Sequence, residues 1–260
     1  MALTLAYVGA AYRGFQANAG VPTVEAAVAE ALTRSGLVAA ANGGDLKKVG
    51  WSKAARTDAG VSAVGNVVGI KLELPREVTV DAGALVVSRL NAALPPDITI
   101  LGAVRVPGGF SARSCCGGRA YEYLLPVGAV LRGGPPGGRE AWPAAVARLN
   151  GSLAALTGTL WAHNLTNGVG LPPPPAARRY VTRFEVEPES FLLYMIRKMV
   201  AAALLRHAGA TPPAVYAAIT DPAVRVSVPP APAAGLLLAG CSYDAYQRRS
   251  AAMYAGETKV

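Results

Sequence analysis

Strand-like and helix-like segments alternate along this chain, and the alternation limits it to folds in which helices pack on sheets. Residues 1–8 alternate as a strand does, and Thr23 precedes a run, Val24 to Ser35, with alanine and leucine at helical spacing and Gly36 as a stop. The later segments are predicted as strand 64–74, helix 81–93, strands 98–106 and 120–126, helix 142–156, strand 180–187, helix 191–206, a short helix near 215 and strand 236–243. This order predicts an α/β or α+β protein.

The charge of the chain narrows its possible partners. With 260 residues it can bury a sizeable core, as one large domain or two modest ones. It carries 25 Lys and Arg against 16 Asp and Glu, which gives a net charge of +9. The excess favours a polyanionic partner, nucleic acid before an anionic membrane surface, although charge that only confers solubility explains it equally well. The basic residues are scattered, so folding must assemble any basic surface.

Several classes of protein are disfavoured by the residue pattern. Three cysteines, two of them adjacent at Cys115 and Cys116, give neither an even disulfide framework nor the spacing of a zinc site. Prolines interrupt both long uncharged stretches, 152–177 and 226–243, so no membrane-spanning helix is predicted. The first residues show no export signal. His163 and His207 lack metal-binding spacing and are expected to be structural.

The segment most informative for function is KAARTDAGVSA, residues 53–63. It places Asp58 on a glycine-containing turn two residues after Arg56, where polar side chains are presented rather than buried. Taken alone, these two residues are most simply a surface ion pair of little energetic value. Tyr121, in a predicted strand, is most simply a packing residue. The surrounding sequence changes both interpretations.

Seven segments, collinear along nearly the whole chain, form a specific pattern. They are YVGAAYRGFQ (7–16), TVEAAVAEAL (23–32), AARTDAGVSAVGNVV (54–68), RLNAALPPDITILGAVRVPGGFSAR (89–113), RAYEYLLP (119–126), ESFLLYMIRKMV (189–200) and PAPAAGLLL (230–238). Together they resemble the TruA-type tRNA pseudouridine synthases, most of all their eukaryotic nuclear and mitochondrial branch. Agreement over so many ordered segments is far more specific than any single motif.

The resemblance implies a pseudouridine synthase fold of two α/β halves, residues 1–108 and 109–260. Their antiparallel sheets are expected to join across a central basic cleft. The implied activity is isomerisation of uridine to pseudouridine in structured RNA, without a cofactor, after the base flips out of its stack. The implied partner is RNA, tRNA first, with rRNA or another structured RNA as alternatives. The resemblance is compatible with a homodimer and implies no membrane partner. The implied compartment is the nucleus or the mitochondrion.

The resemblance also assigns roles to five side chains. Asp58 corresponds to the family's essential aspartate, and Arg56 to the arginine that fills the space left by the flipped nucleotide. Tyr121 corresponds to the tyrosine that stacks on the flipped base, Arg197 to the arginine that pairs with the catalytic carboxylate, and Arg113 to a basic residue that lines the cleft. A paired guanidinium keeps a carboxylate ionised. Attack by Asp58 at C6 of the base and at C1′ of the sugar both remain open.

Three positions depart from the family pattern. Ser62 stands where many members have histidine, Ala201 where a glycine is common, and Asn164 where an acidic residue is usual. A second function therefore stays in view, an RNA-binding structural component of a ribonucleoprotein such as a ribosome, with catalysis incidental or lost. The intact Asp58 and Arg197 favour the enzyme.

Overall fold

The structure is a computed structural model that describes residues 1–260 apart from 44, 75–80, 132–141, 168, 182–193 and 257–260. The chain forms two compact units, Met1–Glu122 with Leu237–Val260, and Tyr123–Leu236. The strands are β1 (Ala2–Tyr7), β2 (Ser52–Lys53), β3 (Ser62–Gly69), β4 (Ile98–Val104), β5 (Gly118–Tyr123), β6 (Gly158–Trp161), β7 (Arg178–Val181) and β8 (Leu236–Ser242). The helices are α1 (Val24–Arg34), α2 (Ala40–Gly43), α3 (Ala82–Ala93), α4 (Val127–Leu131), α5 (Trp142–Ala154), α6 (Met195–His207), α7 (Pro213–Ala218) and α8 (Asp244–Gly256). The predicted α+β class is confirmed.

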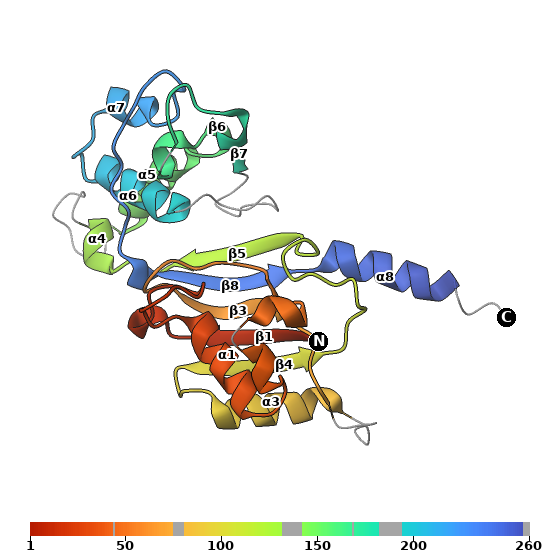
Figure 1. The fold of residues 1–260 in the computed structure, drawn as a ribbon. Coiled ribbons are helices and arrows are strands. Elements are labelled where there is room, and N and C mark those ends of the chain that lie inside the picture. Colours follow the sequence, from red (N-terminus) through yellow and green to blue (C-terminus); the bar gives the residue numbers. More distant parts are fainter. Residues whose placement is uncertain (44, 75–80, 132–141, 168, 182–193, 257–260) are drawn as a thin grey trace. The chain divides into compact units, whose positions relative to one another are not determined.

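The first unit is built on one mixed sheet with the strand order β4-β1-β3-β8-β5, and β2 pairs with β3 (Figure 1). β1 is antiparallel to both β3 and β4. β3 and β8 are parallel, with Ser62 opposite Leu237. The sheet is therefore mixed, whereas the family resemblance implied antiparallel sheets. The reason is that β8 follows β5 only after the whole second unit, so no hairpin constrains its direction.

The compact units divide the chain differently from the predicted halves 1–108 and 109–260. Strands β5 and β8 both pair within the first sheet. The chain therefore leaves the first unit at the end of β5 and returns to it at the start of β8. Backbone hydrogen bonds between strands thus place the boundary at residues 122/123 and give the C-terminal segment to the first unit.

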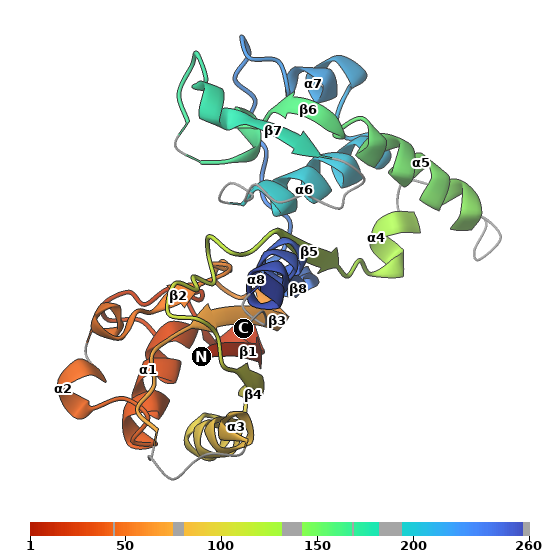
Figure 2. The same cartoon turned by 90° about the vertical axis from the view of Figure 1, so that its right-hand side faces the viewer.

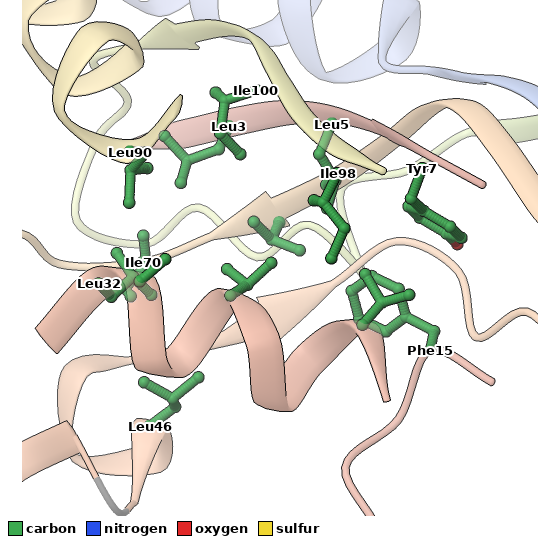
Figure 3. Packing of buried hydrophobic residues seen from close by; sticks show 14 of the residues in the cluster. Leu3, Leu5, Tyr7, Phe15, Leu32, Leu46, Ile70, Leu90, Ile98 and Ile100 are labelled. Atoms are coloured by element: carbon green, nitrogen blue, oxygen red, sulfur yellow. The ribbon is translucent and has the colours of Figure 1, made fainter. Parts of the chain in front are cut away.

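One face of this sheet is covered by α1 and α3, which lie side by side (Figures 1 and 2). Along β1 every second side chain is buried, as a half-buried strand requires. Leu3 and Leu5 of β1 pack in one cluster with Leu32 of α1 and Leu90 of α3 (Figure 3). Thr23 caps α1 by accepting a hydrogen bond from the Ala26 amide at 3.3 Å, as predicted. This cluster is the main core of the first unit.

The same unit contains a second, smaller cluster of buried side chains, to which residues near both ends of the chain contribute. Ala54, Val67, Ala112 and Cys116 are buried together. The ring of Phe110 contacts Tyr243 and Tyr246, with ring centroids 5.6 and 5.3 Å apart. Tyr246 belongs to α8, which the sequence analysis did not predict.

The second unit packs around α6. Met195 and Met199 of α6 are buried with Leu160 of β6 and Tyr216 of α7. The end of α6 is joined to α4 by His207, whose Nε2 lies 2.6 Å from the Val130 carbonyl oxygen.

Two polar residues of the segment after β6 are buried in the second unit. His163 Nε2 lies 3.0 Å from the Val224 carbonyl oxygen. Asn164 donates to the carbonyls of Ile219 and Val224 and accepts from the Val226 amide. His163 and His207 are thus buried structural residues, as predicted. Asn164, which stands where the family usually has an acidic residue, holds the neighbouring loop.

Two element boundaries differ from the predictions for identifiable reasons. β3 ends at Gly69 rather than near Leu74, because β1 begins at Ala2 and offers no partner further along. The Lys71 and Glu73 amides bond instead to carbonyls of Val49 and Leu37. The predicted strand 180–187 and helix 191–206 overlap β7 and α6, and residues 182–193 between them lie outside the described residues.

Three observations of the described residues bear on the predicted exclusions. None of the helices in these ranges combines the length and the apolar character that crossing a membrane requires. All three cysteines are free thiols. The described part of the chain holds no group of three or more His, Cys, Asp and Glu arranged to bind a metal ion.

The core of the first unit gives a stability prediction. Leu5 is 0% exposed, so Leu5→Ala should lower the free energy of unfolding by about 2–5 kcal/mol through lost apolar burial and the cavity left behind. Leu101→Ala is the matched control, because Leu101 lies in the same sheet and is 55% exposed. Urea unfolding followed by circular dichroism measures both. Equal losses for the two variants would contradict this core assignment.

Candidate active site

The segment that carries Asp58 is a turn between β2 and β3 with no regular secondary structure. The Val61 amide donates to the Asp58 carbonyl at 3.1 Å, and Gly60 adopts a φ of 78°, which favours glycine. Arg56 is exposed, Thr57 is buried and Asp58 is half-buried. The turn therefore buries the Thr57 hydroxyl, while its neighbours in sequence, the Arg56 guanidinium and the Asp58 carboxylate, are exposed and half-buried.

Two side chains from the sheet hold the residues that lead into the turn. The Asn66 carboxamide bonds to both backbone groups of Ala55, accepting from its amide at 3.2 Å and donating to its carbonyl at 3.1 Å. Arg119 of β5 donates through Nε and Nη2 to the Ala54 carbonyl, at 2.8 and 2.6 Å. Backbone groups outside a strand ladder need such partners when they are buried. Both partners come from strands of the first sheet.

A third contact fixes the middle of the turn from within the core. The hydroxyl groups of Tyr7 and Thr57 lie 2.8 Å apart, and Tyr7 is 3% exposed. Burial raises the pKa of Tyr7 to about 12, while its hydrogen bonds with Thr57 and Asn66 act in the opposite direction. The Tyr7 ring also contacts Phe15, with the centroids 5.8 Å apart (Figure 3). Thr57 is thereby tied to β1.

The segment after β1 approaches the turn closely at two glycines. The Phe15 amide donates to the Thr57 carbonyl at 3.0 Å. Gly14 has a φ of 103°, and a Cβ added there would lie 3.0 Å from the Thr57 oxygen. A Cβ on Gly9 would lie 2.1 Å from the Val61 oxygen, and the Gly9 amide donates to Ser62 Oγ at 3.0 Å. A side chain at either glycine would push this segment off the turn.

A buried ion pair anchors β2 just before the turn. Glu25 of α1 accepts from Lys53 Nζ at 2.6 Å, from Trp51 Nε1 at 2.5 Å and from the Ala17 amide at 2.6 Å. These bonds join α1, β2 and the segment after β1, and removing one partner of such a buried pair is strongly destabilising.

Among the predicted site residues, Asp58, Arg56, Tyr121 and Arg113 belong to the first unit. Tyr121 of β5 packs against the main core, and burial raises its pKa. The Asp58 carboxylate adds to this rise in the pKa of Tyr121, so the two side chains lie within electrostatic reach of each other. Arg119 lowers the same pKa.

Arg113 is exposed on the segment between β4 and β5. Its neighbour Ala112 is held from two sides, because its amide donates to Ser52 Oγ at 3.0 Å and its carbonyl accepts from the Tyr243 hydroxyl at 2.7 Å. The segment is thereby attached to β2, the strand that leads into the turn.

Arg197 belongs to the second unit, on α6. Its Nε donates to the Ala231 carbonyl at 2.6 Å, and the Ala231 amide donates back to the Arg197 carbonyl at 3.0 Å. Its guanidinium lies 5.3 Å from the centroid of the Tyr194 ring. The side chain is thus fixed within its own unit, and its pairing with Asp58 stays a prediction.

Sequence reasoning missed the residues that hold the turn. Arg119 stands in the segment RAYEY, but only Tyr121 was singled out there. Asn66 is a polar amide in the otherwise apolar strand SAVGNVVG. A polar residue at a buried strand position signals a specific hydrogen-bond partner, so this signal was present in the sequence.

Comparisons with known proteins show what the chain is similar to. The family model described as tRNA pseudouridine synthase matches residues 145–244. The human pseudouridylate synthase 1 homolog is 33% identical over 269 aligned residues, which cover 95% of this chain and 61% of the human protein. The chain is similar to proteins of the tRNA pseudouridine synthase family.

Other members of the synthase family align over a similar extent. The mouse pseudouridylate synthase 1 homolog is 32% identical over 95% of this chain and 61% of its own length. The tRNA pseudouridine(27/28) synthase of Saccharomyces cerevisiae is 29% identical over 95% of this chain and 85% of the yeast protein. The chain thus spans less than two thirds of the length of the human and mouse proteins.

The buried hydroxyl under the turn gives a pH prediction. Tyr7 has a folded-state pKa near 12 against an ordinary 10.0, so its contribution to stability is fully present below pH 10 and is lost as the pH rises toward 12. A difference of this size corresponds to roughly 2–3 kcal/mol. Tyr7→Phe should be less stable than the parent at pH 8, and the gap should shrink above pH 10. Urea unfolding at both pH values tests this, and a constant gap would contradict it.

Proposed function

We propose that this chain is a tRNA pseudouridine synthase, an isomerase that converts uridine to pseudouridine in structured RNA. The observation that carries the proposal is the turn at Asp58, which side chains of β1, β3 and β5 hold in place, with Arg56 exposed and Asp58 half-buried. A catalytic carboxylate needs such support, because a positioned group is effective only when its geometry is fixed before the substrate arrives.

The reaction explains why these residue types are needed together. Isomerisation breaks the bond between N1 and C1′, rotates the base and joins C1′ to C5, while C5 releases its hydrogen as a proton and N1 takes up a proton. A base cannot rotate while stacked in a helix, so the nucleotide must flip out, at a cost of a few kcal/mol. In this proposal Arg56 fills the vacated space, and the Tyr121 ring stacks on the extruded base.

Asp58 acts in its ionised form in either of the two open mechanisms. It attacks C6 of the base, or it attacks C1′ or stabilises positive charge there. The step involves no redox change, hydrolysis or phosphate transfer, so the proposal requires no cofactor. Arg197 keeps the role of carboxylate partner that the family resemblance implies.

The charge of the chain supports RNA as the substrate, and the family resemblance puts tRNA first. The net charge is +9, and Arg56 and Arg113 are exposed on the unit that carries Asp58. Contacts to phosphates supply most of the affinity for a folded RNA, and shape supplies much of the selectivity. A homodimer and a nuclear or mitochondrial location stay predictions of the resemblance.

Tritium release from RNA labelled at C5 of uridine tests the catalytic role. The parent protein should release tritium from tRNA, and Asp58→Asn should release none above background, because the amide can be neither nucleophile nor anion. Asp97→Asn is the matched control, since Asp97 is a half-buried aspartate of the same unit that accepts from the Tyr12 hydroxyl at 2.8 Å. Its activity should stay near that of the parent.

The same assay separates the enzyme from the structural alternative. Binding of tRNA, rRNA and small nuclear RNA without tritium release by the parent protein would favour an RNA-binding component of a ribonucleoprotein. Release that survives Asp58→Asn would remove Asp58 from the catalytic role.

Salt dependence tests the proposed RNA surface. Arg113→Ala should weaken tRNA binding and reduce the slope of log K against log salt by about 1, as expected for the loss of one phosphate contact. Arg34→Ala is the control, because that exposed guanidinium already pairs with Glu30 at 2.9 Å. Fluorescence anisotropy from 50 to 200 mM salt measures both slopes. An unchanged slope for Arg113→Ala would place Arg113 outside the RNA interface.

A further inference from the structure

Asn66 is a fully buried polar side chain in the middle of β3, with 0% exposure. Its carboxamide uses both of its ends. The oxygen accepts from the amides of Ala55 and Val67, at 3.2 and 2.9 Å. The nitrogen donates to the Ala55 carbonyl at 3.1 Å and to the Tyr7 hydroxyl at 3.4 Å. The polar groups of this side chain are thus directed at the chain entering the turn and at the tyrosine beneath it.

The Asn66 carboxamide bonds to the backbone at the point where the hydrogen-bond ladder between β2 and β3 ends. β2 pairs with β3 through Ser52 and Lys53, and the Ala54 amide still donates to the Val67 carbonyl at 2.8 Å. One residue later the backbone has left the ladder, and both polar groups of Ala55 bond to the Asn66 side chain instead. A side-chain carboxamide carries an acceptor oxygen and two N–H donors, so it can bond to both backbone groups of one residue and still donate to a third group. Asn66 therefore lets the chain turn away from the sheet without leaving buried backbone groups unpaired.

The contacts continue from Asn66 to the residue that precedes the carboxylate. Asn66 donates to Tyr7, and the Tyr7 hydroxyl is 2.8 Å from Thr57 Oγ1. The turn is thus held at Ala55 and at Thr57, the two residues that flank Arg56, by one connected set of hydrogen bonds. Both anchors lie within three residues of Asp58, so a shift at either would move the carboxylate.

We propose that Asn66 is a positioning residue for the reaction, which sets the direction of Asp58 by fixing the backbone of Ala55 and, through Tyr7, the side chain of Thr57. The inference rests on the proposed function, because positioning has a catalytic effect only if Asp58 is the catalytic group. Misplacement of a reacting group by about 1 Å can cost about 100-fold in rate. Such a loss appears in kcat, while affinity for RNA, which depends on other groups, is retained.

The chain contains a matched control for this type of contact. Asn91 of α3 makes the same two-ended bond, donating to the Ile100 carbonyl at 3.0 Å and accepting from the Ile100 amide at 2.7 Å. Asn91 is exposed, whereas Asn66 is buried, and Asn91 holds a strand of the main core of the first unit rather than the turn. Both variants lose a carboxamide that bridges the two backbone groups of one residue, whereas an effect on positioning should appear only at Asn66.

The test compares Asn66→Ser with Asn91→Ser in steady-state formation of pseudouridine on tRNA. We expect kcat of Asn66→Ser to fall about 10- to 100-fold, with KM within about twofold of the parent, because the hydroxyl cannot span both groups of Ala55. Asn91→Ser should keep both constants near those of the parent. Asn66→Asp, which keeps the shape of the side chain and its acceptor but lacks the amide donors, replaces the serine variant if that variant does not fold.

Hydrogen exchange of residues 54–61 provides a readout that is independent of activity. Exchange should be faster than in the parent for the Asn66 variant and unchanged for Asn91→Ser. Unchanged exchange in the turn, an unchanged kcat, or equal losses of kcat for both variants would overturn the positioning role. A parent protein that forms no pseudouridine would instead count against the proposed function, and the exchange result would still decide whether Asn66 holds the turn.

Discussion

The backbone of residues 54–58 lies outside any helix or strand, yet it is partly buried and must hold a carboxylate in one direction. The rest of the site follows from how its polar groups find partners. Ala55 bonds to a side chain of β3, the Ala54 carbonyl to Arg119 of β5, and Thr57 to Tyr7 of β1. Each partner stands on a strand of the same sheet. Hydrogen bonds from the sheet of the first unit thereby fix the geometry of the turn at Asp58.

Charged side chains near the turn have different partners. Glu25 and Lys53 form an ion pair, with Lys53 Nζ 2.6 Å from Glu25 Oε2. Arg119 bonds to a carbonyl and opposes the effect of burial on the pKa of Tyr121, while the Asp58 carboxylate reinforces that effect. A tyrosine that keeps its proton stays a neutral aromatic surface, which suits stacking on a base. The carboxylate then remains the group best suited to react with a sugar or a base.

The sequence predicted most helices and strands, but not the direction of every strand or the hydrogen bonds that hold the turn. Periodicity and the capping residue Thr23 predicted α1, and the glycine after Asp58 predicted the turn. The direction of β8 was out of reach, because it depends on how the chain returns from the second unit. The role of Asn66 was also missed, since a strand pattern does not reveal which nearby backbone groups lack partners. Arg197 was assigned by resemblance alone, and contacts within its own unit leave that role a prediction.

The central claim is that a rigid turn presents Asp58 to an extruded uridine. A crystal structure of the Asp58→Asn variant bound to tRNA tests this most directly. The account predicts one nucleotide flipped out of its stack, with residue 58 within hydrogen-bonding reach of its ribose or base, about 2.6–3.2 Å, and the Tyr121 ring against the base. It also predicts that the hydrogen bonds at Ala55 and Thr57 are unchanged. A bound RNA whose bases all stay stacked, or a flipped base held away from residue 58, would contradict the account.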